Sequence, residues 1–176
     1  MAPNNNYNNK GNFSQNRNNN GNKGYQNHNN GSAKKEAQSF PYKQLSESDY
    51  VETAQQVVLS LPRKNIGKKT ETFELTTSQI RNLLAMTSEI LNKINSCKGE
   101  DITTQKLPSS IVQYLNSLKI RSVYESGRQK EVKVFINNAH IIEHLNEIKN
   151  ITDCELFCHY MEALVAYHRF HGGNDK

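Results

Sequence analysis

The stretch from Ile120 to Phe135 carries the side chains best suited to chemistry. It sets four cations against two acids, with one aromatic ring between the arginines: Arg121, Tyr124, Glu125, Arg128, Lys130, Glu131 and Lys133. On a helix, Arg121 and Arg128 would share a face and lie about 10 Å apart along the axis. A row of cations beside an aromatic side chain suits a polyanionic strand better than a small substrate. The alternative for an isolated basic run is a solvated helix face.

Cations elsewhere in the chain favour binding to nucleic acid. Arg81 is expected near the start of a helix, just off its apolar stripe, and Lys119 precedes the basic run. The segment AYHRFHGG holds His168 and Arg169 at an expected helix C-terminus, where cations are stabilising whatever the function. The sequence lacks zinc-finger, RNA-recognition and homeodomain patterns. We therefore expect contacts to the phosphate backbone, with a steep dependence on salt and without base-specific readout.

Metal and catalytic chemistry have weaker support. Cys154 and Cys158 lie four residues apart with His159 adjacent, but zinc needs four converging ligands. Four further histidines could contribute: His140, His144, His168 and His171. Buried cysteines on an apolar stripe explain the pair more simply. The sequence has no Gly-rich phosphate loop, nucleophile elbow or HExxH motif. We expect a protein that is not an enzyme and has no metal or cofactor.

Composition indicates where the protein works. Three cysteines, Cys97 being the third, and the lack of an apolar leader argue for a reducing cytoplasm. No apolar run reaches the roughly eighteen residues of a membrane span. Residues 1–35 hold five basic residues and no acid, so the net charge of +5 belongs to this end of the chain. The remainder is electrically balanced, and its basic stretches are offset by an acid-rich stretch at 143–162.

Two domains are predicted. Residues 1–40 form an asparagine-rich, basic, low-complexity tail that cannot bury enough apolar surface to fold. It is either a source of loose RNA affinity or a spacer. Residues 41–176 form the folded domain.

Helical spacing of apolar residues runs through that domain and predicts an all-α, five-helix bundle without a sheet. The first helix is expected to begin at Ser46 or Ser48 and to end at Pro62, before a basic connector over 63–70. The second should open with a capping box, Thr76 with Gln79, and stop at Gly99.

The remaining three helices follow from similar signals. The third is expected to begin at Pro108, with Gly127 as a cap or soft point. The fourth runs over 130–150 and is apolar on more than one side, which predicts a central position. The fifth opens with a capping box, Thr152 with Glu155, and ends at Gly172–Gly173.

Three segments resemble the small helical subunit of type III-A CRISPR effector complexes, in the Csm family. They are LTTSQIRNLLAMTSEI at 75–90, IRSVYESGR at 120–128 with VKVF at 132–135, and FCHYMEALVAYHRFHGG at 157–173. The resemblance covers roughly 45–173, and the asparagine-rich tail lies outside it. Ser126 departs from the alanine expected there.

The resemblance implies a non-catalytic protein present in several copies along a crRNA–target RNA duplex. Its implied partners are both RNAs, the backbone subunits, the large subunit with Cas10-type domains, and other copies of itself. It assigns RNA contacts to Arg81, Arg121, Arg128, His168 and Arg169. Copies stacked along RNA need two complementary patches, which the basic 119–133 and acidic 143–162 stretches could supply. The rival hypothesis is a protein-only helical adaptor without direct RNA contact.

Overall fold

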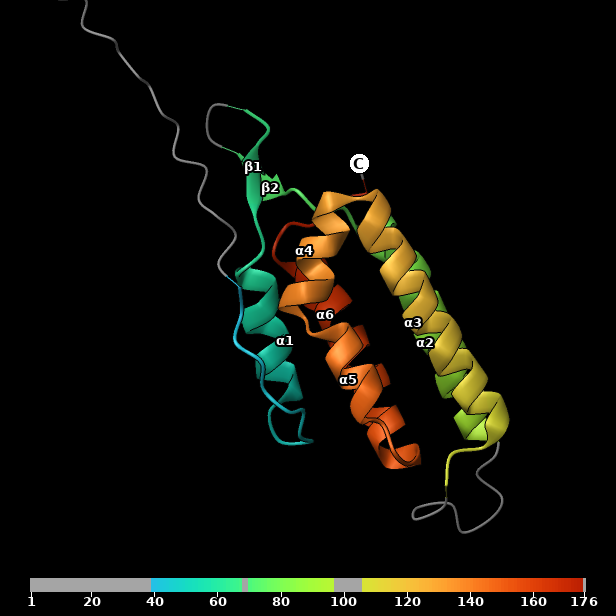
Figure 1. Cartoon of the computed structure of the whole chain (residues 1–176). Helices are drawn as coiled ribbons and strands as arrows, with labels where there is room; N and C mark the ends of the chain where they lie inside the picture. The colour runs from blue at the N-terminus through green and yellow to red at the C-terminus, as the bar shows by residue number, and fades with distance from the viewer. Residues whose placement is uncertain (1–38, 68–69, 97–105, 176) are drawn as a thin grey trace, which may run out of the picture. The chain divides into compact units, whose positions relative to one another are not determined.

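The computed structural model describes residues 39–67, 70–96 and 106–175. The predicted tail up to residue 38, Cys97 and the predicted stop at Gly99 lie outside the described residues. Within these ranges the chain forms six helices and one two-stranded hairpin (Figure 1). In order, they are α1 (Tyr50–Leu59), β1 (Arg63–Asn65), β2 (Glu71–Phe73), α2 (Thr77–Ser96), α3 (Ser109–Arg128), α4 (Lys130–Asn138), α5 (Ile141–Glu147) and α6 (Ile151–Phe170).

Helix α6 lies at the centre of the folded unit. It packs against α1 and α2, while α3 packs against α2, α4 and α5 (Figure 1). Its inward side chains include several of the largest fully buried ones in the core, Phe157, Tyr160 and Met161 among them. The central position had been predicted for the 130–150 segment, but α6 occupies it: α6 packs against α1, α2 and α5, whereas α4 packs against α3 and α5.

The mostly helical fold is confirmed, and the hairpin corrects the prediction of no sheet. Strand β1 lies in the expected basic connector and pairs antiparallel with β2, which follows the connector, with Arg63 opposite Phe73. The strands have three residues each, too short for a readable alternation of apolar residues. The hairpin is anchored to the end of α6 by two hydrogen bonds: the Thr72 hydroxyl donates to the Gly172 carbonyl at 3.0 Å, and Arg63 Nη2 donates to the His171 carbonyl at 3.3 Å. Within the hairpin, the Arg63 guanidinium lies 4.3 Å from the Phe73 ring centroid.

The predicted fourth helix is broken into α4 and α5. His140 adopts a left-handed conformation, with φ 49° and ψ 38°. The break frees the Ala139 carbonyl, which accepts a hydrogen bond from the buried Tyr160 hydroxyl at 3.2 Å. The His140 ring donates to the Phe40 carbonyl at 2.8 Å. These partners lie far away in the sequence, so the periodicity of 130–150 alone could not indicate the break.

Helix ends were predicted with mixed success. The Thr76–Gln79 capping box is confirmed: the Thr76 amide donates to Gln79 Oε1 at 2.7 Å, and the Gln79 amide to Thr76 Oγ1 at 3.3 Å. At α6 the predicted box is wrong, because Asn150 is the cap and accepts from the Asp153 amide at 2.8 Å.

Three other predicted boundaries also shift. Asp49 precedes α1 in place of either serine, Pro108 lies just outside α3, and α3 continues through Gly127 to Arg128.

Candidate nucleic-acid interface

Four residues near the C-terminal end of α3 form what we call the α3 cluster: Arg121, Tyr124, Glu125 and Arg128. Arg121 Nη2 lies 2.7 Å from Glu125 Oε1, and Arg128 Nη1 lies 3.6 Å from Glu125 Oε2. The Glu125 side chain is 4% exposed, whereas those of Arg121 and Arg128 are 40% and 57% exposed. One buried carboxylate thus lies beneath two solvent-facing guanidinium groups.

The Tyr124 ring joins the two arginines into one surface. Its centroid lies 5.7 Å from the guanidinium carbon of Arg121 and 5.4 Å from that of Arg128. Both distances are within the range of a cation–π contact. The tyrosine is 55% exposed, so its ring is accessible together with the cations beside it.

Gln129 ties this cluster to α2 and turns the chain into α4. Its side-chain amide donates to Glu125 Oε2 at 3.1 Å and accepts from Gln79 Nε2 at 2.7 Å. Its extended backbone, with φ −135° and ψ 117°, separates α3 from α4. Lys130 and Lys133 therefore lie on a second helix, beyond the bend. Both are exposed, and neither has a side-chain partner among the described residues.

Arg81 and Arg169 meet at a second position, which we call the Asp175 cluster. Arg81 Nη2 lies 3.0 Å from Asp175 Oδ1, and Arg169 Nη1 lies 3.3 Å from Asp175 Oδ2. All three side chains are about half exposed. The two clusters flank the start of α2, because Arg81 faces Asp175 while Gln79, two residues earlier, contacts Gln129.

Lys119 lies away from both clusters. Its ammonium group donates to the Asn146 side chain at the end of α5. Because residues two apart on a helix differ by about 200° in direction, Lys119 and Arg121 lie on opposite sides of α3. Proximity in sequence had grouped them, and the helix separates them.

His168 is fully buried. A carbonyl can only accept, so the ring donates from Nε2 to Leu75 at 3.0 Å; Nδ1, 3.4 Å from the Thr77 hydroxyl, is left as an acceptor. The ring also stacks on Phe73 with 4.9 Å between centroids. Burial lowers the pKa of His168, more than the hydrogen bond to Leu75 raises it. A side chain without exposed surface cannot meet RNA, so the structure corrects this assignment and gives His168 a structural role.

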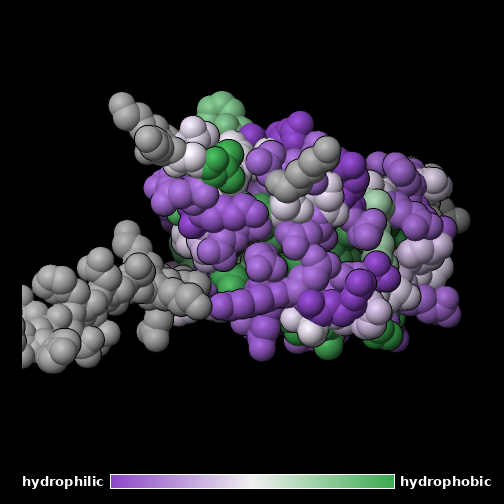
Figure 2. Space-filling model, turned by 90° about the horizontal axis from the view of Figure 1, so that it is seen from above, coloured by the Kyte–Doolittle hydropathy of each residue, from purple (hydrophilic) through white to green (hydrophobic). Residues whose placement is uncertain are grey.

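An apolar groove runs beside the α3 cluster, between α2 and α3. It is lined by Asn82 and Met86 from α2, and by Ser117, Ile120, Arg121 and Tyr124 from α3. Sequence reasoning missed this groove, although Ile120 off the apolar stripe of α3 was a signal. The end of the folded unit that carries the hairpin and the α3–α4 turn is mainly hydrophilic, with isolated hydrophobic patches (Figure 2).

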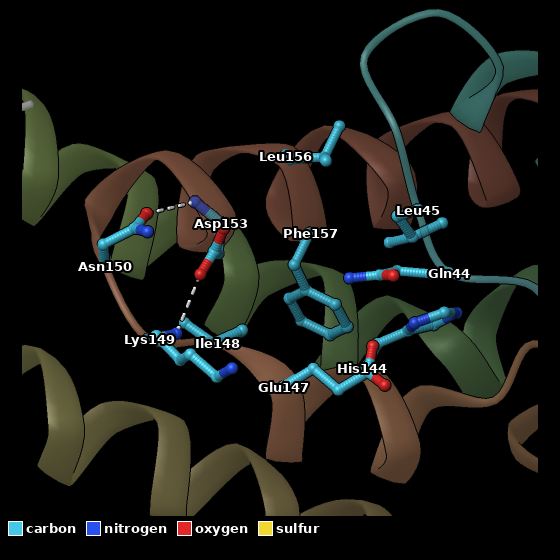
Figure 3. Close-up of a pocket in the computed structure, with 10 residues that line it drawn as sticks. All are labelled: Gln44, Leu45, His144, Glu147, Ile148, Lys149, Asn150, Asp153, Leu156 and Phe157. Atoms are coloured by element: carbon cyan, nitrogen blue, oxygen red, sulfur yellow. Dashed lines mark hydrogen bonds between the residues drawn. The ribbon is translucent and has the colours of Figure 1, made fainter.

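A pocket of about 250 Å³ lies on another side, where α5 leads into α6 (Figure 3). Phe157 and Leu45 line it together with polar side chains, among them Glu147 and Asp153. Asp153 Oδ2 accepts from the Lys149 amide at 2.9 Å, which closes the turn before α6. The pocket lies within the acid-rich stretch predicted as one half of a contact between copies.

The two described cysteines are core residues. Cys154 and Cys158 are buried, and the side-chain hydrogen bond with Cys154, together with burial, raises the pKa of Cys158. Among residues 39–67, 70–96 and 106–175, no group of three or more histidine, cysteine or acidic side chains is arranged to hold a metal ion. No helix in these ranges has the length and apolar character needed to span a membrane.

The class that emerges is a small, mostly helical protein with arginine pairs on its outer helix faces. Comparison with known proteins identifies the family. Residues 54–174 match the family model described as Csm2 Type III-A. The chain is 36% identical over 131 residues to a "CRISPR system Cms protein Csm2" of Streptococcus thermophilus, covering 74% of this chain and 98% of that protein.

Two further relatives carry the same name. The protein from Mycobacterium tuberculosis is 37% identical over 131 residues, covering 74% of this chain and 97% of its own length. The protein from Enterococcus italicus is 34% identical over 104 residues, covering 57% of this chain and 71% of its own length. The chain therefore belongs to the Csm2 family of type III-A CRISPR systems. Members of this family are generally non-catalytic small subunits.

Proposed function

We propose that this protein is the small subunit of a type III-A CRISPR effector complex, where it binds crRNA–target RNA through phosphate contacts without sequence specificity. The observation that carries the proposal is the α3 cluster, with two half-exposed arginines around an exposed tyrosine. Arg81, Arg169, Lys130 and Lys133 extend the proposed surface. His168 is left out because it is buried, and Lys119 because it faces α5.

The ion pairs of the α3 cluster support this role. Two guanidinium groups share one carboxylate, so the cluster keeps a net positive charge. Each guanidinium has five N–H donors, and the contact to Glu125 uses only part of that set. Glu125 therefore orients the arginines from below, and their exposed donors remain available for phosphate oxygens. A fixed cation loses less conformational entropy on binding than a free one.

Within the complex we propose contacts to other Csm subunits and between copies of this chain. The exposed acids Glu143 and Glu147 on α5 and Glu162 on α6 support an acidic half of such a contact. A basic surface on the neighbouring copy would complete it. Because the two halves differ, the contact is heterologous and can repeat along an RNA without closing.

The test uses a triple variant, Arg121→Gln, Glu125→Gln and Arg128→Gln. Replacing the acid together with both cations avoids leaving a buried carboxylate unpaired. The triple variant lowers the net charge by one, as does the control Lys43→Gln on the segment before α1. We expect the reconstituted complex with the triple variant to bind target RNA more weakly, and its salt slope to decrease by about 1 to 2. Lys43→Gln should leave both nearly unchanged.

Unchanged affinity and salt slope in the triple variant would exclude the α3 cluster as an RNA contact. The protein-only adaptor is the other outcome, and the exposed Ile120 and Val123 beside the cluster are the observation that favours it. Ultraviolet crosslinking of the assembled complex separates the two functions. We expect crosslinks between Tyr124 and RNA; crosslinks from this face to protein alone would favour the adaptor.

A further inference from the structure

The Asp175 carboxylate occupies a position suited to a phosphate group. Arg81 on α2 approaches one of its oxygens at 3.0 Å, and Arg169 on α6 approaches the other at 3.3 Å. A phosphodiester likewise presents two charged oxygens on one centre, and arginine pairs recognise that geometry well. The carboxylate thus marks a site where two helices aim cations at one small oxyanion.

The backbone that carries Asp175 is held in place. The Gly173 amide donates to the His168 carbonyl at 2.8 Å, and the Thr77 amide donates to the Asn174 carbonyl at 2.8 Å. The Ser78 hydroxyl donates to the Asp175 carbonyl at 2.9 Å. Asp175 is therefore placed over the start of α2 by its backbone, and its side chain alone makes the contact to the arginines.

The contact itself is weak. The side chains of Arg81, Arg169 and Asp175 are 62%, 58% and 45% exposed. Ion pairs at such exposure contribute little because water and salt screen them. A rotation of the Asp175 side chain would release both arginines without disturbing the backbone hydrogen bonds. An RNA phosphate, which brings the charge of an entire strand, can thus replace it.

We propose that Arg81 and Arg169 form a phosphate-binding site for the RNA backbone, and that Asp175 fills this site until RNA displaces it. The inference rests on the proposed RNA-binding function and adds to it an internal competitor that lowers the affinity of the free chain. Cations on α2 and α6 then become available only when a phosphate is present. Loose binding to other anions is reduced by the same competition.

Asp175→Asn tests the site because it removes the charge and keeps the shape of the side chain. Glu52→Gln, at an exposed position in the first turn of α1, is the control with the same change in net charge. Binding of a fluorescent oligouridine to the full chain is measured by anisotropy from low to moderate salt. We expect Asp175→Asn to bind about three- to tenfold more tightly, as when one or two exposed ion pairs no longer have to be broken. Glu52→Gln should change affinity by less than about twofold.

Two further measurements make the test decisive. In an Arg81→Gln, Arg169→Gln background, Asp175→Asn should give no more gain than Glu52→Gln. In the wild-type chain, NMR signals of the Arg81 and Arg169 Nε–H groups should shift as oligouridine is added. The inference is overturned if Asp175→Asn increases the affinity for oligouridine no more than Glu52→Gln does. It is also overturned if the increase persists in the Arg81→Gln, Arg169→Gln background. If the two arginine substitutions weaken binding while Asp175→Asn has no effect, the competitor alone is refuted. If neither they nor the α3 triple variant weakens binding, the proposed function fails as well.

Discussion

Removing the partners of Glu125 should destabilise the fold, and the structure indicates by how much. Arg121→Gln takes away the closer of the two cations, at 2.7 Å, from a carboxylate that is 4% exposed. Loss of one partner from a fully buried ion pair costs about 3–5 kcal/mol, and an exposed pair contributes about 0–1 kcal/mol. Here the acid is buried and the arginine is 40% exposed, so we expect a loss between these limits, about 1–2 kcal/mol.

A double-mutant cycle isolates this interaction. Arg121→Gln, Glu125→Gln and the double variant are compared with the wild type by urea unfolding followed by circular dichroism. In the Glu125→Gln background no buried charge remains, so Arg121→Gln should cost less than about 0.5 kcal/mol. The expected coupling energy is therefore about 1 kcal/mol.

The control is Arg81→Gln, which removes an exposed arginine from a pair with the exposed Asp175. Its effect on unfolding should stay within about 0.5 kcal/mol. Strictly additive effects of Arg121→Gln and Glu125→Gln would refute the idea that the buried carboxylate depends on its arginines. Helicity retained in every variant would show that the cycle compares folded proteins.

Three further outcomes are expected. Burial lowers the pKa of His144 from 6.5 to about 4. As the pH falls, His144 is therefore protonated at a higher pH in the unfolded chain than in the folded chain. The free energy of unfolding should decrease between about pH 6.5 and 4, by on the order of 3 kcal/mol. His168 contributes in the same direction, and His144→Gln should reduce the loss seen in urea unfolding at several pH values. Gly173→Ala should lower the melting temperature, because a Cβ there would overlap both the ring and the carbonyl of His168; its cost is about 1–3 kcal/mol, and an unchanged melting temperature would contradict the packing described. Thr76→Ala should cost about 1 kcal/mol through loss of the α2 cap, whereas Gln79→Glu should preserve the box, and equal urea midpoints for both variants would contradict the capping assignment.

The helical part of the fold could be predicted because its signals are local. Apolar residues recur every three or four positions on α2 and α3, and the Thr76–Gln79 box lies within one turn. The break at His140 could not be predicted in this way. It depends on the Tyr160 hydroxyl and on the Phe40 carbonyl, which reach Ala139 and His140 only after the helices have packed.

Part of the proposed site could likewise be predicted from local helix geometry, and part depended on packing. The sequence by itself determined that Arg121, Tyr124 and Arg128 share a face, since helix geometry fixes the direction of residues three to seven apart. Only the tertiary structure decided that Glu125 lies buried beneath them. A basic run in sequence also grouped Lys119 with these residues, although the turn of α3 directs it toward Asn146.

Long-range contacts decided which charged side chains of α2 and α6 are exposed and what they contact. His168 and Arg169 are neighbours in sequence, yet one is fully buried and the other is exposed beside Asp175. Which of two adjacent side chains faces the core depends on how α6 packs against its neighbours. The meeting of Arg81 with Asp175 joins residues 94 positions apart. Residue types and helical spacing thus fixed which charges the chain carries and which helix bears them, while packing fixed which of those charges are available.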